Sequence, residues 1–154
     1  DIKFDYIFIA FNTFLHILTN EDASKCFQCI KKHLADDGEF IFDIVLPNPS
    51  FLHTDKKDYM LVMDFKDSVE ADTVEIYESC IYNNKTEVCD ISWEYRYKEK
   101  QRMNKMFEFE MRMYYPDTMN RLLIDSGFSI EAIYGDYEQS RFNEQSPLQI
   151  YRCK

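Results

Sequence analysis

The chain has 154 residues, a length that corresponds to a single domain. An apolar fraction of 45% with 13 Phe and 11 Tyr can fill a core, whereas only three Gly and four Pro argue against a disordered chain. The net charge of −10 disfavours nucleic acid and anionic membrane surfaces as partners, because both attract basic faces. No stretch approaches the roughly 20 apolar residues of a membrane span.

Five cysteines, an odd number, in a chain with a good core indicate reduced thiols rather than a disulfide framework, so we expect a cytoplasmic protein. Cys26 and Cys29 form a C-x-x-C pair, but they lie within a helical pattern. No second Cys pair or His pair follows at the spacing of a metal site. The sequence therefore predicts no metal.

The first segment, residues 4–10, is an apolar run that leads into a polar turn at residues 11–16. An unbroken apolar run is typical of a parallel strand that is covered on both faces. This strand begins four residues into a chain whose first residue is Asp. We therefore expect the sequence to start in the middle of a fold.

A strand–helix–strand unit occupies residues 4–46. Thr19 is placed to cap a helix, apolar residues recur at helical spacing from Ala23 to Leu34, and Gly38 follows the end of this pattern. Residues 39–46 form a second apolar strand that Pro47 halts. Connections of this length predict a right-handed unit with two parallel strands.

The middle of the chain has the period of two that is typical of antiparallel strands. Residues 74–82 and 86–97 are expected to pair around a hairpin tip at residues 83–85, and residues 107–114 supply another strand. The alternation predicts one aromatic face and one solvated face. Residues 50–66 are ambiguous between a short helix at Pro49 and Ser50 and a strand over residues 59–65.

Helical spacing returns after Pro116, and Gly127 is placed to end this helix in the left-handed conformation. Strands are expected over residues 128–137 and 148–153, with a polar connection between them.

Three segments together resemble the C-terminal portion of class I S-adenosylmethionine-dependent methyltransferases of the small-molecule type. They are residues 4–16, 34–43 and 114–137, in the order and spacing of that family. The resemblance implies an α/β fold: a partial Rossmann-like sheet with strands equivalent to 4-5-7-6 and an inserted antiparallel β section. The implied organisation is 1–49 and 114–154 for the Rossmann-like half-domain and 50–113 for the insertion, which serves as a substrate lid.

The family's glycine-rich cofactor loop is absent from these residues, since the three glycines at 38, 127 and 135 form no G-x-G pattern. The resemblance therefore implies about half of an enzyme, truncated before these residues and inactive alone. It would transfer methyl from S-adenosylmethionine to a small-molecule N or O acceptor. A first strand without its neighbour exposes an edge, so we expect self-association or pairing with the missing half through Tyr6–Ala10.

The resemblance also implies the site residues. Ala10, Phe11 and Asn12 end the first strand, where the cofactor's methionine portion would bind; the alternative is that Asn12 caps a turn and Phe11 belongs to the core. His16 would accept a proton from the acceptor, with Tyr114 as another candidate base. For His16 the alternative is packing between Phe14 and Ile17.

Within the antiparallel section, Trp93 and Arg112 are the expected substrate contacts, from a set that also includes Tyr95 and Tyr114. A stripe of alternating aromatics is more often the core of a sheet. Asp43, which interrupts the second strand, either faces the cleft or binds backbone at a turn.

Two other classes of function remain open. One is a non-catalytic α+β module that binds an apolar ligand or mediates oligomerisation through its aromatic sheet. The other is a different Rossmann-like enzyme that lacks its cofactor loop. No nucleophile–base–orienter pattern supports a hydrolase.

Overall fold

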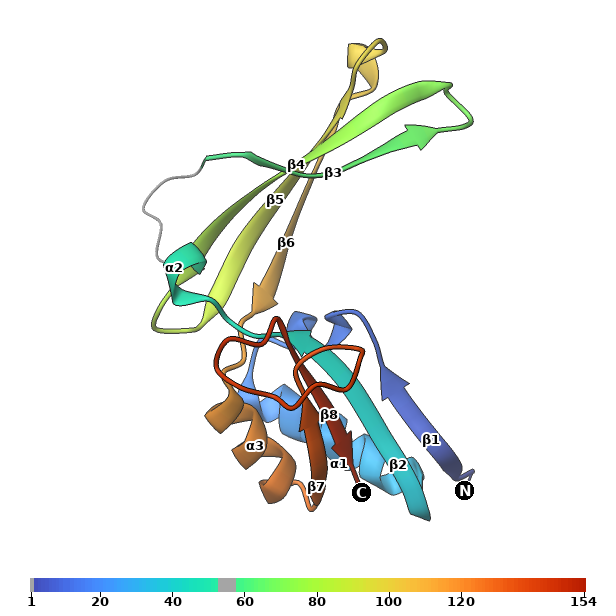
Figure 1. The fold of residues 1–154 in the computed structure, drawn as a ribbon, viewed down its shortest axis with the longest axis vertical. Helices are drawn as coiled ribbons and strands as arrows, with labels where there is room; N and C mark the ends of the chain where they lie inside the picture. Colours follow the sequence, from blue (N-terminus) through green and yellow to red (C-terminus); the bar gives the residue numbers. More distant parts are fainter. Residues whose placement is uncertain (1, 53–57) are drawn as a thin grey trace. The chain divides into compact units, whose positions relative to one another are not determined.

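The computed structural model describes residues 2–52 and 58–154. The chain forms two compact units, of which the first joins Asp1–Pro47 to Arg112–Lys154 and the second is Asn48–Met111 (Figure 1). The fold is mixed α/β with two four-stranded sheets, one in each unit. None of the helices in the described part of the chain is long and apolar enough to cross a membrane.

The sheet of the first unit has the order β1 (Phe4–Ile9), β2 (Leu34–Val45), β8 (Leu148–Cys153), β7 (Ile130–Tyr134). β1 and β2 are parallel, whereas β8 is antiparallel to both of its neighbours, β2 and β7. This is the order predicted for the four strands. The last strand of the sequence, β8, lies between β2 and β7 and runs antiparallel to both. Within the described residues β1 pairs on one side only, so its other edge is open.

Two helices and a 3₁₀ turn accompany this sheet. They are η1 (Thr13–His16), α1 (Asn20–His33) and α3 (Pro116–Asp125). The predicted caps are confirmed: the Thr19 hydroxyl accepts the Asp22 N–H at 3.1 Å, and Gly127 ends α3 with φ of 86°. In Figure 1, α1 lies behind the sheet. Its residues Ala23, Phe27 and Ile30 are buried there.

The core of the first unit is a layer of aromatic rings centred on Phe27, which is 0% exposed. Phe27 stacks on Phe14 with ring centroids 4.8 Å apart. Phe42 stacks on Tyr151 at 4.9 Å and on Phe40 at 5.1 Å. These contacts join η1, α1 and the middle of the sheet, so the aromatic residues hold the elements of this unit together.

Two strand boundaries differ from the sequence prediction. β2 begins at Leu34, directly after α1, although residues 34–38 were expected to end the helix. The pairing shifts from Phe4–Leu34 to Tyr6–Glu39, so the extra residues of β2 bulge away from β1. The strand expected over 128–137 is shorter, because the chain turns where Gly135 N–H donates to the carbonyl of Ser140 at 2.8 Å.

The second unit contains α2 (Pro49–Leu52) and an antiparallel sheet in the order β3-β4-β5-β6. The strands are β3 (Met60–Asp67), β4 (Asp72–Asn83), β5 (Val88–Tyr97) and β6 (Lys105–Arg112), with η2 (Gln101–Met103) before β6. The predicted hairpin is confirmed, and both readings of residues 50–66 hold in part: a short helix and then a strand. Part of that segment, residues 53–57, lies outside the described residues.

One face of this sheet carries the predicted aromatic stripe. Trp93 meets Phe109 edge-on at 5.3 Å, and Tyr95 meets Phe107 at 5.3 Å. The indole N–H of Trp93 donates to Glu78 at 2.6 Å. The stripe is incompletely covered, since Phe107 is 50% exposed.

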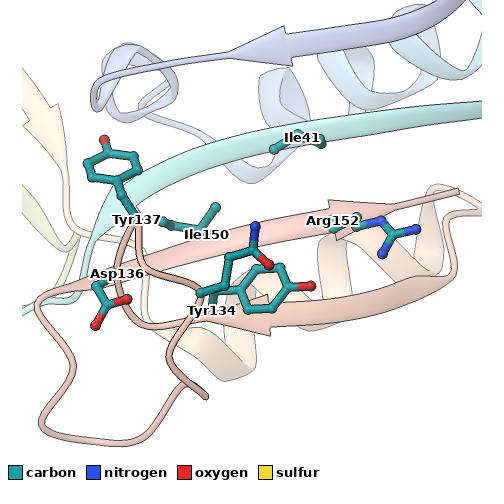
Figure 2. Close-up of a pocket in the computed structure, with 7 residues that line it drawn as sticks. Ile41, Tyr134, Asp136, Tyr137, Ile150 and Arg152 are labelled. Atoms are coloured by element: carbon teal, nitrogen blue, oxygen red, sulfur yellow. The ribbon is translucent and has the colours of Figure 1, made fainter.

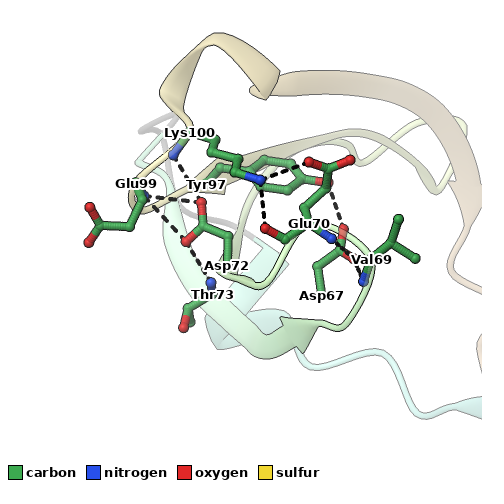
Figure 3. A network of polar contacts seen from close by, with 8 residues as sticks. All are labelled: Asp67, Val69, Glu70, Asp72, Thr73, Tyr97, Glu99 and Lys100. Carbon is green, nitrogen blue, oxygen red and sulfur yellow. Dashed lines mark hydrogen bonds and ion pairs between the residues drawn. The ribbon is translucent and has the colours of Figure 1, made fainter.

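Polar contacts tie the β3–β4 turn to the segment after β5 (Figure 3). The buried Asp72 carboxylate accepts the N–H groups of Thr73, Glu99 and Lys100. Desolvation raises the pKa of Asp72, but these backbone hydrogen bonds outweigh it and leave the pKa below its ordinary value of 3.8. The backbone N–H groups of Glu70 and Val69 likewise lower the pKa of Asp67.

These pKa shifts predict acid sensitivity of the second unit. A carboxyl whose folded pKa is depressed stabilises the fold above its unfolded pKa, and this contribution is lost as the pH falls through the folded pKa. We expect the urea midpoint, followed by fluorescence of Trp93, to fall steeply below about pH 4. Asp72→Asn should flatten this dependence, whereas Asp90→Asn on the exposed side of β5 should not. An unchanged profile in Asp72→Asn would show that the network does not stabilise the sheet.

The aromatic layer predicts a large cost for truncating its central ring. Phe27→Ala should lower the free energy of unfolding by about 3–5 kcal/mol, because it removes a buried ring and leaves a cavity. Ile124→Ala on the exposed side of α3 should change it by less than about 0.5 kcal/mol. Urea unfolding followed by far-UV circular dichroism, which reports mainly on α1 and α3, measures both. Equal effects of the two substitutions would contradict this assignment of the core.

Candidate functional site

The turn that follows β1 has an unusual backbone conformation. Phe11 and Asn12, two successive residues other than glycine, both have φ of 62°. This left-handed region is sparsely populated by residues with a β-carbon, and such residues cluster at functional sites. The turn lies at the carboxyl end of a parallel strand, the edge of an α/β sheet where ligands bind.

The carboxylate of Asp43 on β2 holds this turn. Both of its oxygens lie 3.0 Å from the backbone nitrogen of Phe11. Asn12 adds two bonds to the same strand: its N–H donates to the carbonyl of Asp43 at 3.3 Å, and its Oδ1 accepts the N–H of Val45 at 2.8 Å. The conformation is therefore determined by contacts from β2, which lies more than 30 residues later in the sequence.

Asp43 has a second partner, from the segment after β7. The hydroxyl of Tyr137 donates to Oδ2 of Asp43 at 3.1 Å. Desolvation and this hydrogen bond raise the pKa of Tyr137 above its ordinary value. Asp43 is 7% exposed, so its carboxylate is satisfied by these backbone and side-chain donors rather than by water.

Tyr137 also borders a cavity on the face of the sheet away from Phe27 (Figure 2). Its volume is about 360 Å³, and Ile41 and Ile150 line it from β2 and β8. Tyr134 and Arg152 line its other part. The Arg152 guanidinium is already paired with Glu39 at 2.6 Å. Asp136 also lines the cavity, and its carboxylate accepts the N–H groups of Glu138 and Ser140. The cavity thus adjoins the turn and carries one carboxylate that backbone donors hold.

The side chains of the turn are open to solvent. Phe11 is 83% exposed, which contradicts its alternative assignment to the core, and Ala10 is also exposed. The Ala10 carbonyl accepts from the hydroxyl of Thr13 at 2.7 Å, which starts η1. Asn12 is half-buried, and its side chain bonds to β2 rather than capping η1. The turn therefore presents backbone and an apolar ring to a ligand, while Asp43 and Asn12 maintain its conformation.

His16 ends η1 and is exposed. Its neighbours Phe14 and Leu15 are 1% exposed, so η1 buries those two residues and leaves the imidazole toward solvent. The alternative of a histidine packed between Phe14 and Ile17 is therefore wrong. A histidine in this position is accessible to a substrate.

The structure places Tyr114 and Arg112 in the interior of the first unit. Tyr114 is 0% exposed, and its hydroxyl donates to the carbonyl of Ile17 at 2.5 Å. Arg112 is 8% exposed and donates to Oδ1 of Asn20 at 2.7 Å, with its guanidinium 4.5 Å from the Tyr114 ring. Arg112 is the last residue of β6 in the antiparallel section, as expected, but its side chain packs with the first unit. These hydrogen bonds to Ile17 and Asn20 hold in place the segment that leads into α1.

Trp93, the other expected substrate contact, lies in the second unit. It is half-buried among Tyr95, Phe109 and Glu78. These contacts belong to the sheet itself, and a role in binding substrate stays a prediction.

Tyr137 is the residue of this site that the sequence did not suggest. Asp43 and Tyr137 are 94 residues apart, and the polar segment around Tyr137 shows no periodicity. The one available signal was the carboxyl group of Asp43 within an apolar strand, which requires donors when it is buried.

Comparison with solved structures identifies the fold. The CcbJ methyltransferase from Streptomyces caelestis superposes on 99% of this chain with a TM-score of 0.81 at 16% identity. An S-adenosylmethionine-dependent methyltransferase from Clostridium acetobutylicum matches 100% of the chain with a TM-score of 0.77 at 20% identity. The sugar N-methyltransferase KedS8 from Streptoalloteichus matches 97% with a TM-score of 0.65 at 12% identity.

The chain shares the fold of these methyltransferases. It spans 61%, 59% and 56% of their respective lengths. No protein-family profile matches the sequence, and no curated protein matches it at a significant level. At identities this low, the likeness establishes the fold alone.

The geometry of the turn predicts the effect of substitutions at Asp43 and Tyr137. Asp43→Asn leaves one acceptor oxygen and turns an amide N–H₂ group toward donors, so we expect a loss of about 1–3 kcal/mol in the free energy of unfolding. Tyr137→Phe removes one bond at a solvent-accessible site and should cost at most about 1.5 kcal/mol. Chemical denaturation measures the cost, and the amide resonance of Phe11 in a ¹H–¹⁵N spectrum reports the turn. An unshifted Phe11 amide in Asp43→Asn would contradict the assignment.

Proposed function

We propose that this chain is the C-terminal part of an enzyme that transfers methyl from S-adenosylmethionine to a small-molecule nitrogen or oxygen acceptor. One observation carries the proposal. The chain has the methyltransferase fold and, at the carboxyl edge of its parallel strands, a left-handed turn maintained by a buried carboxylate. Maintaining two residues in this conformation costs free energy, which indicates selection for a ligand.

The residues at the turn fit one part of the cofactor. Ala10, Phe11 and Asn12 would contact its methionine portion, with the exposed Phe11 ring available for apolar contact. A glycine-rich cradle for the rest of the cofactor is absent from this sequence. The proposal therefore assigns that cradle to a part of the protein outside these residues.

When bound, S-adenosylmethionine supplies a methyl group on a cationic sulfur, and the bond from carbon to the acceptor forms as the bond to sulfur breaks. The residues of this chain would orient the acceptor and remove its proton. His16 is the candidate base, because it is exposed beside the turn, whereas the hydroxyl of Tyr114 is buried and bonded to a carbonyl. We expect the main contribution of these residues to the reaction rate to be the orientation of the acceptor toward the methyl group.

Within the described residues one edge of β1 is unpaired, which favours the pairing of another strand with it. Tyr6 and Phe8 are 70% and 73% exposed, an unusual exposure for residues of a parallel strand in an α/β sheet. The solved structures of the same fold are longer than this chain. We propose that Tyr6–Ala10 pairs with the remaining part of the protein, and that self-association of the isolated chain uses the same edge.

A non-catalytic binding module is the second candidate. The aromatic face of the second unit favours it, because Met63 and Phe107 are 56% and 50% exposed within that sheet. The two functions differ in their ligand, since a binding module has no requirement for S-adenosylmethionine.

Calorimetric titration with S-adenosylmethionine tests the proposal. Protein that includes the residues upstream of Asp1 should bind it, and this chain alone should bind far more weakly. Asn12→Ala in the longer protein should weaken binding about tenfold or more, because the turn loses its bond to Val45, whereas Asn84→Ala at the hairpin tip should have no effect. If the longer protein binds no S-adenosylmethionine, the enzyme proposal fails and the binding module takes its place.

Substitution of the candidate base separates catalysis from binding. His16→Gln should lower kcat by about 10²–10⁴ with cofactor affinity unchanged, since a general base contributes to the transition state only. His33→Gln, near the end of α1, is the matched control and should leave kcat unchanged. The assay follows labelled methyl transferred to a panel of amino sugars and other small amines, chosen because KedS8 is a sugar N-methyltransferase. Full activity of His16→Gln would exclude His16 as the base.

A further inference from the structure

Two cysteines of the second unit lie in contact, although neither is near the proposed methyl-transfer turn in the sequence. In the β4–β5 register, Cys80 is opposite Ile91 and Cys89 is opposite Tyr82, which makes the two cysteines diagonal neighbours on one face. Their sulfur atoms are 2.8 Å apart. A disulfide requires sulfurs about 2.0 Å apart, so closure must bring the two sulfur atoms closer by less than about 1 Å, with whatever backbone adjustment the cross-link geometry demands.

The two thiols differ in exposure and in acidity. Cys89 is 0% exposed, whereas Cys80 is half-buried and accessible to a small reagent. The hydrogen bond with Cys89 lowers the pKa of Cys80, although burial and the carboxylates of Glu78 and Asp90 oppose this. The same bond raises the pKa of Cys89. The arrangement is that of an attacking thiolate beside a buried thiol that resolves it.

We propose that Cys80 and Cys89 are a redox-modification site that closes reversibly to an intramolecular disulfide on reaction with a low-molecular-weight disulfide such as oxidised glutathione. The Cys80 thiolate attacks one sulfur of the reagent, which forms a mixed disulfide and releases one glutathione thiolate. Cys89 then loses its proton and attacks the sulfur of Cys80, which releases the second glutathione. Two protein thiols are oxidised, and one oxidised glutathione is reduced to two molecules of glutathione.

The remaining cysteines lack this arrangement. Cys153 is buried, and burial raises its pKa to about 12. Burial also raises the pKa of Cys26, so its thiol is less ionised near neutral pH. Cys29 is exposed. In the described part of the chain the printed sulfur–sulfur contact is that of Cys80 with Cys89, so the geometry favours these two over the C-x-x-C pair for an intramolecular cross-link.

Closure would link adjacent strands across their hairpin. The cross-link joins β4 to β5 on the face that carries Trp93 and Ile91, and it maintains the pairing of the strands on either side of the turn at residues 84–87. Oxidation would therefore stabilise the second unit, and reduction would release it.

Equilibration of this chain with mixtures of reduced and oxidised glutathione tests the proposal. After acid quenching and alkylation, peptide mapping by mass spectrometry should show a Cys80–Cys89 cross-link with a loss of two hydrogen masses. The glutathione ratio at half-oxidation should correspond to an effective concentration about 100-fold higher in the folded chain than in the urea-unfolded chain, because the fold holds the two sulfurs together.

Single substitutions test the order of the steps. Cys89→Ser should accumulate a stable mixed disulfide of glutathione at Cys80, whereas Cys80→Ser should react slowly at the buried Cys89. Circular dichroism establishes that each variant is folded. If a variant does not fold, the peptide mapping of the unsubstituted chain still tests the proposal. Equal effective concentrations in the folded and unfolded chain, or oxidation at Cys26 and Cys29 with Cys80 and Cys89 still reduced, would overturn the proposal.

Discussion

The first unit depends on how the chain leaves β1, and the buried carboxylate of Asp43 controls this step. A parallel strand must turn at its carboxyl edge before the following helix can pack on the sheet. Here the turn passes through two residues in the left-handed conformation, which costs free energy. Asp43 offsets this cost by accepting the Phe11 N–H with both carboxylate oxygens. Because the carboxylate is buried, it requires those donors as much as the turn requires an acceptor. The same interaction directs Phe14 into the core and leaves Phe11 exposed.

The two sheets of the chain are stabilised in different ways. In the first unit, helices cover one face and aromatic rings fill the space between, so burial is nearly complete around Phe27 and Phe42. In the second unit a hairpin-based sheet relies on cross-strand pairs, such as Trp93 with Phe109, and on polar ties such as those of Asp72. Cross-strand pairs contribute less free energy than a buried core, so polar ties and the proposed Cys80–Cys89 cross-link have more influence on the stability of the second unit.

Much of the fold was predictable because it follows from local periodicity. The helix over residues 20–33 and the hairpin around residues 83–85 follow from spacing and turn chemistry. The antiparallel direction of the final strand was implied by the family resemblance alone. The early start of β2 at Leu34 was not predictable, since it depends on pairing with Phe4, some 30 residues away. Long-range pairing overrides local signals of this kind.

The site was predictable only in part, for the same reason. The turn at residues 10–12 was located by its place at the end of an apolar strand. Tyr114 and Arg112 looked available because polar groups on an alternating segment are usually exposed, yet tertiary contacts with Ile17 and Asn20 bury them. Tyr137 reaches Asp43 through an irregular loop, and no sequence pattern specifies the path of such a loop.

The central claim is that the left-handed turn at Phe11 and Asn12 is a cofactor contact. Amide hydrogen exchange of the longer protein, measured with and without S-adenosylhomocysteine, tests it most directly. The account predicts that binding slows exchange at Phe11 and Asn12 more than at the Phe27 amide in α1, which the fold already protects. Tight binding with unchanged exchange at Phe11 and Asn12 would contradict the claim.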